Sequence, residues 1–369
     1  MVKRGDFFDP CKMNIFNNLK VIELSSVLAG PLVGTFFAEL GAEVLKVENS
    51  KTGGDVTRSW KLSGENPEQS LSAYYASANY GKTSILRNLS DDSDHREILS
   101  LIKKADVVLV NFKPGDALRL ELDFESLLQV NPSLVYGEIV GFSENDPRVA
   151  YDVVLQAETG YMSMNGEPDS PPLKMPLAMI DILTAHQLKE GILCALLQRS
   201  VDGKGRKVTV SLYDSAIASL TNQASNWLMN KQIPQRTGSL HPNIAPYGET
   251  FQCKDGEWIV LAIGSDQQFY RLCGILKMQE LKSDLRFITN AGRVKHRSEL
   301  AIKFKEQFLK KPIAEWAGMM LEQHIPFGQI KDLQAVFEED QAKKLILEQE
   351  MEGIITKRVR TVAFNITGD

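Results

Sequence analysis

From Leu19 onward, short apolar segments with strand character alternate with longer segments of helical character. The first strand–helix–strand unit covers residues 19–48, with Pro31 in the first turn of the helix and Gly41 just after its end, as is usual for helix boundaries. The alternation continues with strands at 83–86, 106–112, 133–142 and 204–212, and with helices at 95–105 and 116–130 and another beginning at 181. Consecutive strands joined by helices predict an α/β fold with a parallel, doubly wound sheet and helices on both faces.

The character of the sequence changes after Asn222, where Asn, Gln, Pro and Gly become frequent. We expect residues 238–258 to form one long irregular loop. The later segments indicate a second domain, with a strand at 258–263 and helices at 265–276, 297–309 and 313–324, followed by a tail that reads as two strands within 351–366. A chain of 369 residues exceeds one typical domain, which agrees with this division.

The charge balance and the cysteine pattern restrict the class of protein. A formal net charge of −5 argues against nucleic-acid binding, but it leaves open an anionic small molecule held by local Lys and Arg side chains. The four cysteines are scattered without a C-x-x-C pair, and the five histidines show no metal-ligand spacing. Neither a signal-peptide core nor a run of about eighteen apolar residues occurs. We therefore expect a cytoplasmic protein with reduced thiols, no metal and no membrane partner.

The first strand–turn–helix unit does not carry a dinucleotide fingerprint. Its turn, SSVLAGPLVG at 25–34, lacks the G-x-G-x-x-G spacing that lets a pyrophosphate approach the backbone. Glu48 ends the second strand, where a ribose-binding acid would lie, but acidic residues at strand ends are common. NAD binding is therefore not predicted.

Two carboxylates, Asp152 and Asp181, each stand at the front of an apolar helical segment, with a Gly-Glu-Pro-Asp-Ser-Pro-Pro loop at 166–172 between them. The simplest interpretation is that each caps its own helix, because Asp is a favoured N-cap residue. A carboxylate at a helix N-terminus can also act as a nucleophile toward a thioester. A folded-back loop would bring both carboxylates into one cleft.

Several ordered motifs give the chain a strong resemblance to the class III CoA-transferases, the family of formyl-CoA transferase and of the carnitine and bile-acid CoA-transferases. The matching segments are the opening unit (19–48), GGDVTR (53–58), ANYGKTSI (78–85), ADVVLVNFKPG (105–115), NPSLVYGEIVGF (131–142), HPNIAPYGETF (241–251) and IPFGQI (325–330). The resemblance covers residues 19–330 in order, and such a series is far more specific than any single motif.

The resemblance implies a fold and a set of partners. It predicts a large Rossmann-like, CoA-binding domain made of residues 1–221 and 335–369, and a smaller α+β domain at 222–334. It implies that two chains interlock as a homodimer. It also implies an enzyme that moves CoA from an acyl-CoA donor to a carboxylic acid, with CoA as a substrate and no other cofactor.

The same resemblance distinguishes the two aspartates. Asp181 matches the nucleophile, which would form an aspartyl anhydride and then an aspartyl-CoA thioester. The related α-methylacyl-CoA racemases need a base on each face of the substrate, and a His followed by Asp supplies one. Tyr151 precedes Asp152 here, and a phenol with a reference pKa of about 10 is a poor base near neutrality, which favours transfer. Asp152 is then expected either to orient CoA or the acceptor, or to cap its own helix.

The resemblance also selects residues for CoA. The backbone of Leu28 and Ala29 matches a CoA-contacting turn, and the remaining matches are Asn111, Phe112, Lys113, Arg119, Ala150, Tyr151 and Asp152. The basic residues considered for the phosphates are Lys46, Arg58, Lys82, Arg87, Lys113 and Arg119. Asn49 and the Asn79–Lys82 segment replace basic residues that are usual in the family, so phosphate binding is expected to depend most on Lys113 and Arg119.

Two alternatives remain from the sequence. One is a racemase or epimerase of the same family, and the other is a CoA-binding protein without transfer activity. The sequence does not identify the acyl donor or the acceptor.

Overall fold

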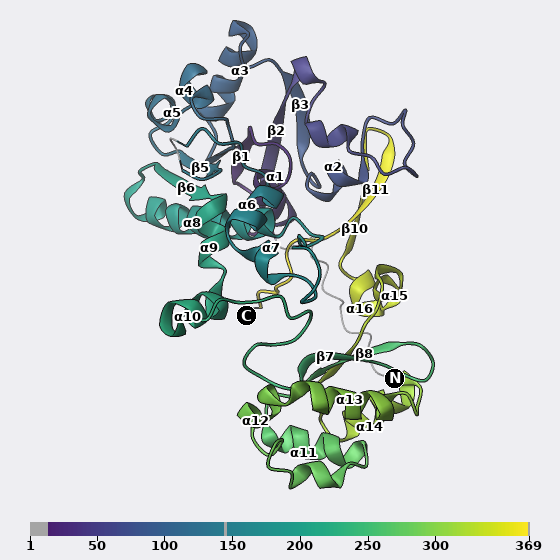
Figure 1. The fold of residues 1–369 in the computed structure, drawn as a ribbon. Helices are drawn as coiled ribbons and strands as arrows, with labels where there is room; N and C mark the ends of the chain where they lie inside the picture. The colour runs from purple at the N-terminus through teal and green to yellow at the C-terminus, as the bar shows by residue number, and fades with distance from the viewer. Residues whose placement is uncertain (1–13, 144–145, 368–369) are drawn as a thin grey trace. The chain divides into compact units, whose positions relative to one another are not determined.

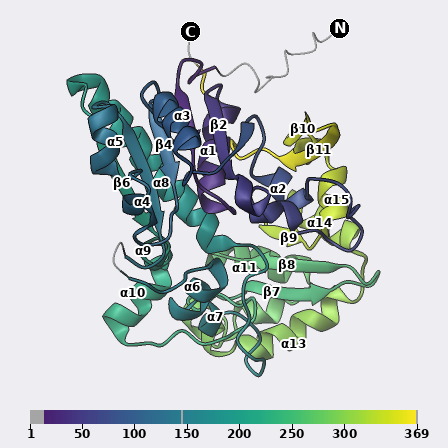
Figure 2. The same cartoon turned by 90° about the horizontal axis from the view of Figure 1, so that it is seen from above.

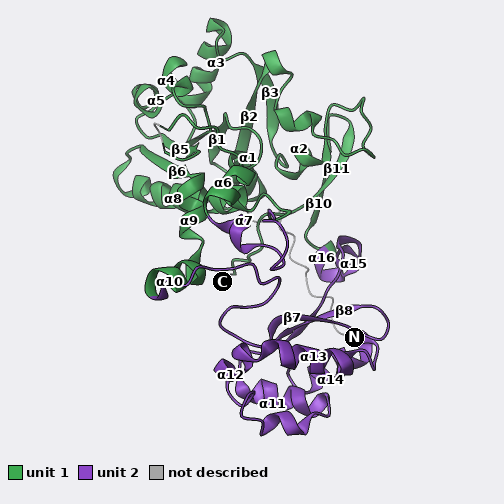
Figure 3. Ribbon diagram, viewed as in Figure 1, with its two compact units in different colours: residues 1–159, 175–229, 343–369 green, residues 160–174, 230–342 purple. Residues whose placement is uncertain are grey.

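The computed structural model describes residues 14–143 and 146–367 (Figure 1). The chain divides into two compact units, which Figure 3 shows in different colours. Unit 1 comprises Met1–Thr159, Met175–Met229 and Lys343–Asp369, and unit 2 comprises Gly160–Lys174 and Asn230–Ala342. The chain thus leaves unit 1 and returns to it twice. Residues 160–174, which the sequence assigns to the large domain, group with unit 2.

Unit 1 is built on a six-stranded sheet in the order β3-β2-β1-β4-β5-β6, and every neighbouring pair is parallel. Its strands are β1 (Lys20–Glu23), β2 (Glu43–Asn49), β3 (Thr83–Arg87), β4 (Val107–Val110), β5 (Val135–Val140) and β6 (Arg206–Ser211). The central strand β4 is buried along its whole length, as a parallel strand covered on both faces must be. This confirms the predicted α/β architecture with a parallel sheet.

Helices cover both faces of this sheet (Figures 1 and 2). The helices of this unit are α1 (Ala29–Glu39), α2 (Ala73–Ser77), α3 (Asp92–Ile102), α4 (Asp116–Arg119), α5 (Phe124–Val130), α6 (Asp152–Glu158), α8 (Met179–Asp202), α9 (Leu212–Ala218) and α10 (Thr221–Asn230), with short 3₁₀ turns η2 (Ser50–Thr52) and η3 (Val56–Ser59). On one face, Ile98 and Ile102 of α3 and Leu127 of α5 pack against strand residues in one apolar cluster. Helices α1 and α8 contact each other and the strands as well.

The predicted helix at 116–130 is wrong in one respect, because it is two helices. Glu121 adopts a left-handed backbone with φ of 52°, which ends α4. Asp123 then begins α5, and its side chain accepts a hydrogen bond from the Ser126 N–H. The break lets Leu122 enter the core, where it is fully buried.

The predicted irregular loop at 238–258 is also wrong, because it contains strand β7 (Tyr247–Gln252), paired antiparallel with β8 (Trp258–Ala262). Phe251 of β7 stacks on Phe308 with ring centroids 4.9 Å apart. Glycine and proline residues before this strand are typical of loops, so the sequence pattern does not indicate a strand here. Its burial in the core of unit 2 decides its conformation.

Unit 2 combines the three-stranded sheet β7-β8-β9 with helices packed around one apolar core. Its further elements are β9 (Phe327–Gln329), α7 (Tyr161–Met164), α11 (Asp266–Ile275), η4 (Gln279–Lys282), α12 (Asn290–Lys295), α13 (Arg297–Phe308), α14 (Ile313–Glu322), α15 (Leu333–Glu338) and α16 (Asp340–Lys343). Within the described parts of the chain, no helix has the length and apolar composition that a membrane span requires.

The C-terminal segment returns to unit 1 as an antiparallel hairpin of β10 (Ile346–Met351) and β11 (Ile354–Val359). Arg358 of β11 pairs with Glu39 at the end of α1 at 2.7 Å, and both side chains are almost fully buried. The Glu39 carboxylate also accepts hydrogen bonds from the N–H groups of Thr361 and Val362. The tail is therefore fixed to α1, the first helix in the described part of the chain.

We predict that Arg358→Ala destabilises unit 1 by about 3–5 kcal/mol, because it leaves the Glu39 carboxylate buried without its cation. Lys357→Ala is the matched control on the same strand, since Lys357 pairs with Glu348 in solvent, and its loss should cost less than about 1 kcal/mol. Denaturant unfolding followed by circular dichroism measures both. Equal losses would show that the buried pair has no special role.

Candidate active site

Helix α8 begins with a cap that comes from a distant part of the chain. Its N-cap residue, Ala178, has no side chain that can accept a hydrogen bond. Instead the Oδ1 atom of Asp152, 28 residues earlier, accepts the Ile180 N–H at 2.7 Å. Asp152 belongs to the first turn of α6, so one carboxylate joins the starts of two helices. A buried helix start needs such an acceptor, because its first N–H groups have no partner within the helix.

Asp181 follows Ile180 in the first turn of α8 and is partly buried. Among the described residues, none donates a hydrogen bond to its carboxylate. Burial, and to a smaller extent the negative charge of Asp152, together raise the pKa of Asp181 to about 7. The oxygens of Asp181 are thus free to react, and they lie in surroundings that disfavour their charge.

The sequence alone allows each aspartate to cap the helix that it begins, and the structure shows a different arrangement. Asp181 caps nothing, because the N-cap position of α8 is Ala178. Asp152 does cap a helix, but the helix is α8, and its own helix α6 has Tyr151 at the N-cap without a side-chain bond. The expected convergence of the two carboxylates does occur.

Gln156 fixes the arrangement, and sequence reasoning did not identify it. Its buried side chain donates from Nε2 to Asp152 Oδ2 at 2.6 Å, and its Oε1 accepts the Met175 N–H at 2.7 Å. It therefore joins α6 to the segment that leads into α8. The only sequence signal is its spacing, since a polar residue four positions after Asp152 lies on the same face of the helix.

Tyr74 of α2 is a second residue that the sequence did not indicate. Burial raises the pKa of its hydroxyl, and the charges of Asp181, Asp152 and Asp55 raise it further. The hydroxyl therefore stays protonated and can donate a hydrogen bond close to the two carboxylates. The rings of Trp60 and Tyr74 pack edge to face, with centroids 5.0 Å apart.

The residues expected to contact CoA follow the carboxyl ends of neighbouring strands. Leu28 and Ala29 lie at the start of α1, after the turn that follows β1, and Leu28 is the N-cap without a side-chain bond. Asn111 follows β4, and its amide exchanges two hydrogen bonds with the backbone of Ser26 at 2.9 and 3.0 Å. The strand order reverses between β1 and β4, and ligands of open α/β sheets bind at such a point.

The segment from Ala150 to Asp152 reaches the same sheet edge beyond β5. A Cβ atom placed on Gly141 would lie 2.5 Å from the Ala150 Cβ, so glycine is required for this close approach. Tyr151 is exposed. The first turn after β1, the β4 end with Asn111 and Phe112, and the start of α6 thus follow three adjacent strands.

The basic residues considered for the CoA phosphates differ in exposure and in their ion-pair partners. Lys113 is exposed and has no ion-pair partner among the described residues, and Arg119 is exposed and paired with Asp116 at 2.8 Å. The hypothesis that Lys46 and Lys82 meet phosphates is wrong, because both are buried and both pair with Glu23. Two other candidates are held by carboxylates of unit 1, Arg58 by Glu48 and Arg87 by Glu97.

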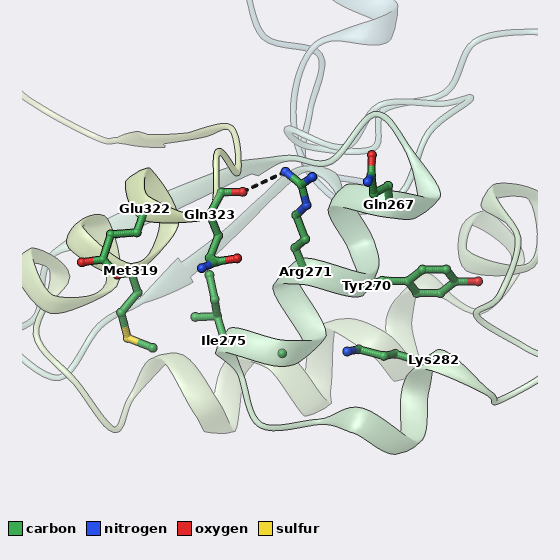
Figure 4. A pocket seen from close by; sticks show the side chains of 9 residues that line it. Gln267, Tyr270, Arg271, Ile275, Lys282, Met319, Glu322 and Gln323 are labelled. Carbon is green, nitrogen blue, oxygen red and sulfur yellow. Dashed lines mark hydrogen bonds between the residues drawn. The ribbon is translucent and has the colours of Figure 1, made fainter.

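A cavity of about 530 Å³ in unit 2 contains none of the predicted site residues (Figure 4). It lies among α11, η4 and α14. The Arg271 guanidinium points into it and donates to the Gln323 carbonyl at 3.2 Å. Its lining has no group comparable to the aspartate pair.

Comparisons with known proteins decide the family. The model of CoA-transferase family III matches residues 16–367. The chain belongs to CoA-transferase family III. It is 36% identical over 354 residues to a succinate–glutarate CoA-transferase of Agrobacterium fabrum, covering 94% of this chain and 88% of that protein. It is 34% identical to the succinyl-CoA:glutarate CoA-transferase of Mus musculus, covering 92% of this chain and 77% of that protein.

A solved structure agrees with this assignment. The crystal structure of a CaiB/BaiF family protein from Brucella suis superimposes with a TM-score of 0.81 at 35% identity, covering 95% of this chain and 92% of that one. The acetyl-CoA:oxalate CoA-transferase of Acetobacter aceti is 34% identical over 322 residues, covering 86% of this chain and 81% of that protein. The chain is therefore an enzyme that transfers CoA between an acyl-CoA and a carboxylic acid.

We predict that Asp181→Asn stabilises the protein at neutral and alkaline pH. An unfolded Asp titrates near 3.8, but the folded carboxyl titrates near 7. Between these values the native state keeps a proton that the unfolded state has lost, so wild-type stability falls as the pH rises. The variant lacks this loss and should gain on the order of 2–4 kcal/mol above about pH 7 and nothing near pH 4.

Denaturant unfolding of the wild type and the variant across this pH range measures the gain. The exposed Asp169 provides a matched control, and Asp169→Asn should show no gain that depends on pH. A constant difference between wild type and Asp181→Asn at every pH would contradict the raised pKa.

Proposed function

We propose that Asp181 is the nucleophile of a ping-pong transfer. Its carboxylate attacks the thioester carbonyl of the donor and expels CoA thiolate, which leaves a mixed anhydride. The thiolate then attacks the aspartyl carbonyl carbon, releases the donor acid and forms an aspartyl-CoA thioester. The acceptor carboxylate attacks this thioester and expels the thiolate again. The thiolate finally attacks the acceptor acyl carbon, which yields the new acyl-CoA and the free Asp181 carboxylate.

The observation that carries this proposal is the unbonded Asp181 carboxylate beside the bonded one of Asp152. The Asp152 oxygens accept from Ile180 and Gln156, whereas Asp181 has no donor among the described residues. Acylation of Asp181 removes its charge and so relieves both its burial penalty and its repulsion by Asp152. The surroundings thus favour the covalent intermediates over the free carboxylate.

The same contacts favour transfer over racemisation. A racemase needs two bases that exchange protons with the α-carbon. Both Asp152 oxygens already have donors, and Tyr151 is an exposed phenol where a histidine would be needed. The site therefore offers one free carboxylate, which suits covalent transfer.

The relatives suggest the substrate class. Succinate and glutarate occur in the names of two relatives above, and mesaconate, another dicarboxylic acid, in that of a relative from Haloarcula hispanica. We propose a dicarboxylyl-CoA donor and a dicarboxylic acid acceptor for this chain. The acyl-CoA is bound by Leu28, Ala29, Asn111, Phe112, Lys113, Arg119 and Ala150–Asp152, and no further cofactor takes part.

We also propose that the chain acts as an interlocked homodimer in the cytoplasm. Its described cysteines, Cys194, Cys253 and Cys273, are free thiols, as is usual in a reducing compartment. Cys11 lies outside the described residues.

We predict that incubation with succinyl-CoA followed by hydroxylamine converts Asp181 to a hydroxamate, which peptide mass spectrometry locates. Asp181→Ala should abolish the adduct and reduce the rate of succinyl transfer to glutarate by at least about 10³-fold, because the neighbouring Asp152 carboxylate is already hydrogen bonded through both oxygens. Circular dichroism shows whether the variant is folded.

Other outcomes distinguish the alternatives. Full activity of Asp181→Ala would refute the mechanism. Deuterium exchange at the α-carbon without transfer would indicate a racemase. Tight CoA binding with no adduct across a panel of acyl-CoA donors would indicate a binding protein without transfer activity.

We predict that Lys113→Ala and Arg119→Ala each raise the KM for acyl-CoA by about tenfold and leave kcat nearly unchanged, because they remove phosphate contacts distant from the thioester. Arg206→Ala is the control, since Arg206 pairs with Asp202 as Arg119 pairs with Asp116 but lies on β6. Steady-state kinetics measure the three variants. An equal effect in Arg206→Ala would indicate a general charge effect.

A further inference from the structure

The turn between β1 and α1 contains a strained residue that the mechanism above does not explain. Val27 has φ of +73°, in the left-handed region. A β-branched residue is a true outlier there, because its Cβ substituents crowd the backbone, and such strain persists only where surrounding contacts impose it. The turn is also the segment that we assign to CoA, so this inference rests on the proposed function.

Asp55 contacts the backbone of Val27 directly. Its carboxylate accepts the Val27 N–H, at 3.1 Å to Oδ2 and 3.4 Å to Oδ1. Thr57 fixes the other side of the carboxylate, because its N–H and Oγ1 both donate to Oδ1, at 3.1 and 2.8 Å. Asp55 belongs to the GGDVTR motif, and its side chain is only 1% exposed.

Asp55 is part of a buried charge cluster made of Glu23, Lys46, Asp55 and Lys82, which we call the turn cluster. Lys46 pairs with Asp55 at 3.1 Å and with Glu23 at 2.9 Å, and it donates to the Ser25 carbonyl at 2.8 Å. Lys82 pairs with Glu23 at 2.7 Å and donates to the Pro31 carbonyl at 2.8 Å. The turn cluster therefore contacts the backbone at Ser25, at Val27 and at Pro31.

The turn itself keeps unused polar groups. The N–H groups of Leu28, Ala29 and Gly30 have no acceptor among the described residues. The Ser25 hydroxyl is buried and also has no partner in the described part of the chain. It lies against Gly30, where a Cβ atom would meet its Oγ at 2.4 Å. Donors that are held in place and left unbonded suit an acceptor-rich ligand.

We propose that Asp55 is a positioning residue for CoA: its carboxylate holds Val27 in the left-handed conformation, which presents the N–H groups of Leu28 and Ala29 to acyl-CoA. Asp55 does not touch the substrate. In its absence the turn relaxes toward the extended region that valine prefers, and the donors move away from their positions.

A double-mutant cycle of Asp55→Asn and Val27→Gly tests the proposal, with CoA affinity measured by calorimetry on the full chain. Asp55→Asn should weaken CoA binding about tenfold, in line with the penalty of a left-handed L-residue. Glycine tolerates the left-handed region, so Asp55→Asn in the Val27→Gly background should weaken binding less than about threefold. Steady-state kinetics should show the Asp55→Asn loss in the KM for acyl-CoA rather than in kcat.

Two further variants separate positioning from stability. Thr57→Val keeps the charges and the side-chain shape but removes one donor to Asp55, and it should weaken CoA binding about threefold while remaining folded. Glu39→Gln weakens a buried ion pair at the other end of α1 and should lower the melting temperature without changing CoA affinity. If Asp55→Asn does not fold, a second double-mutant cycle of Thr57→Val with Val27→Gly replaces the first: Thr57→Val should then weaken CoA binding less in the Val27→Gly background.

Unchanged CoA affinity in Asp55→Asn or in Thr57→Val, or equal losses in the two backgrounds, would overturn the positioning role. A wild-type chain that binds no CoA would instead overturn the proposed function of the turn. The two failures are thus distinguishable.

Discussion

The arrangement of the site depends on one hydrogen bond, from the Ile180 N–H to the Asp152 carboxylate. This bond gives an N–H group at the start of α8, the longest helix of unit 1, an acceptor from the side chain of another helix, α6. It also places a negative charge next to Asp181, which cannot move away because it belongs to the first turn of the capped helix. Gln156 is hydrogen bonded both to Asp152 and to Met175, in the segment that leads into α8. The cap of the buried helix start thus places the two carboxylates together, and burial and the charge of Asp152 both raise the pKa of Asp181.

A second constraint is the burial of charge beneath the first turn of the sheet. The turn cluster places four ionisable side chains inside unit 1 with almost no exposure. Buried ion pairs in proteins often give no more stability than apolar residues of similar size, so stability alone is a weak reason for these ions. Their bonds instead go to the backbone of the turn between β1 and α1, at Ser25, Val27 and Pro31. The cluster fixes the position of backbone groups.

Much of the fold could be predicted from the sequence, because strand and helix periods are local properties. The six parallel strands appear at the expected places. The tail does form two strands, but the pair begins before the predicted range 351–366, with strands at Ile346–Met351 and Ile354–Val359. The errors occur where a tertiary contact overrides the local pattern. The predicted helix at 116–130 is interrupted where Leu122 is buried in the core. Strand β7 forms where Phe251 packs against Phe308. Among the basic residues, Lys46 and Lys82 look like surface charges in the sequence, since burial leaves no local signal there.

The sequence by itself determined the α/β class, the family, and the candidacy of Asp181, because these depend on residue order and on motif spacing. Only the tertiary structure decided the roles of the neighbours. It made Asp152 the cap of α8, identified Gln156 and Tyr74, and divided the basic residues into buried partners and exposed candidates. The physical reason is that charge, burial and hydrogen bonding act through space, between residues that the chain keeps far apart.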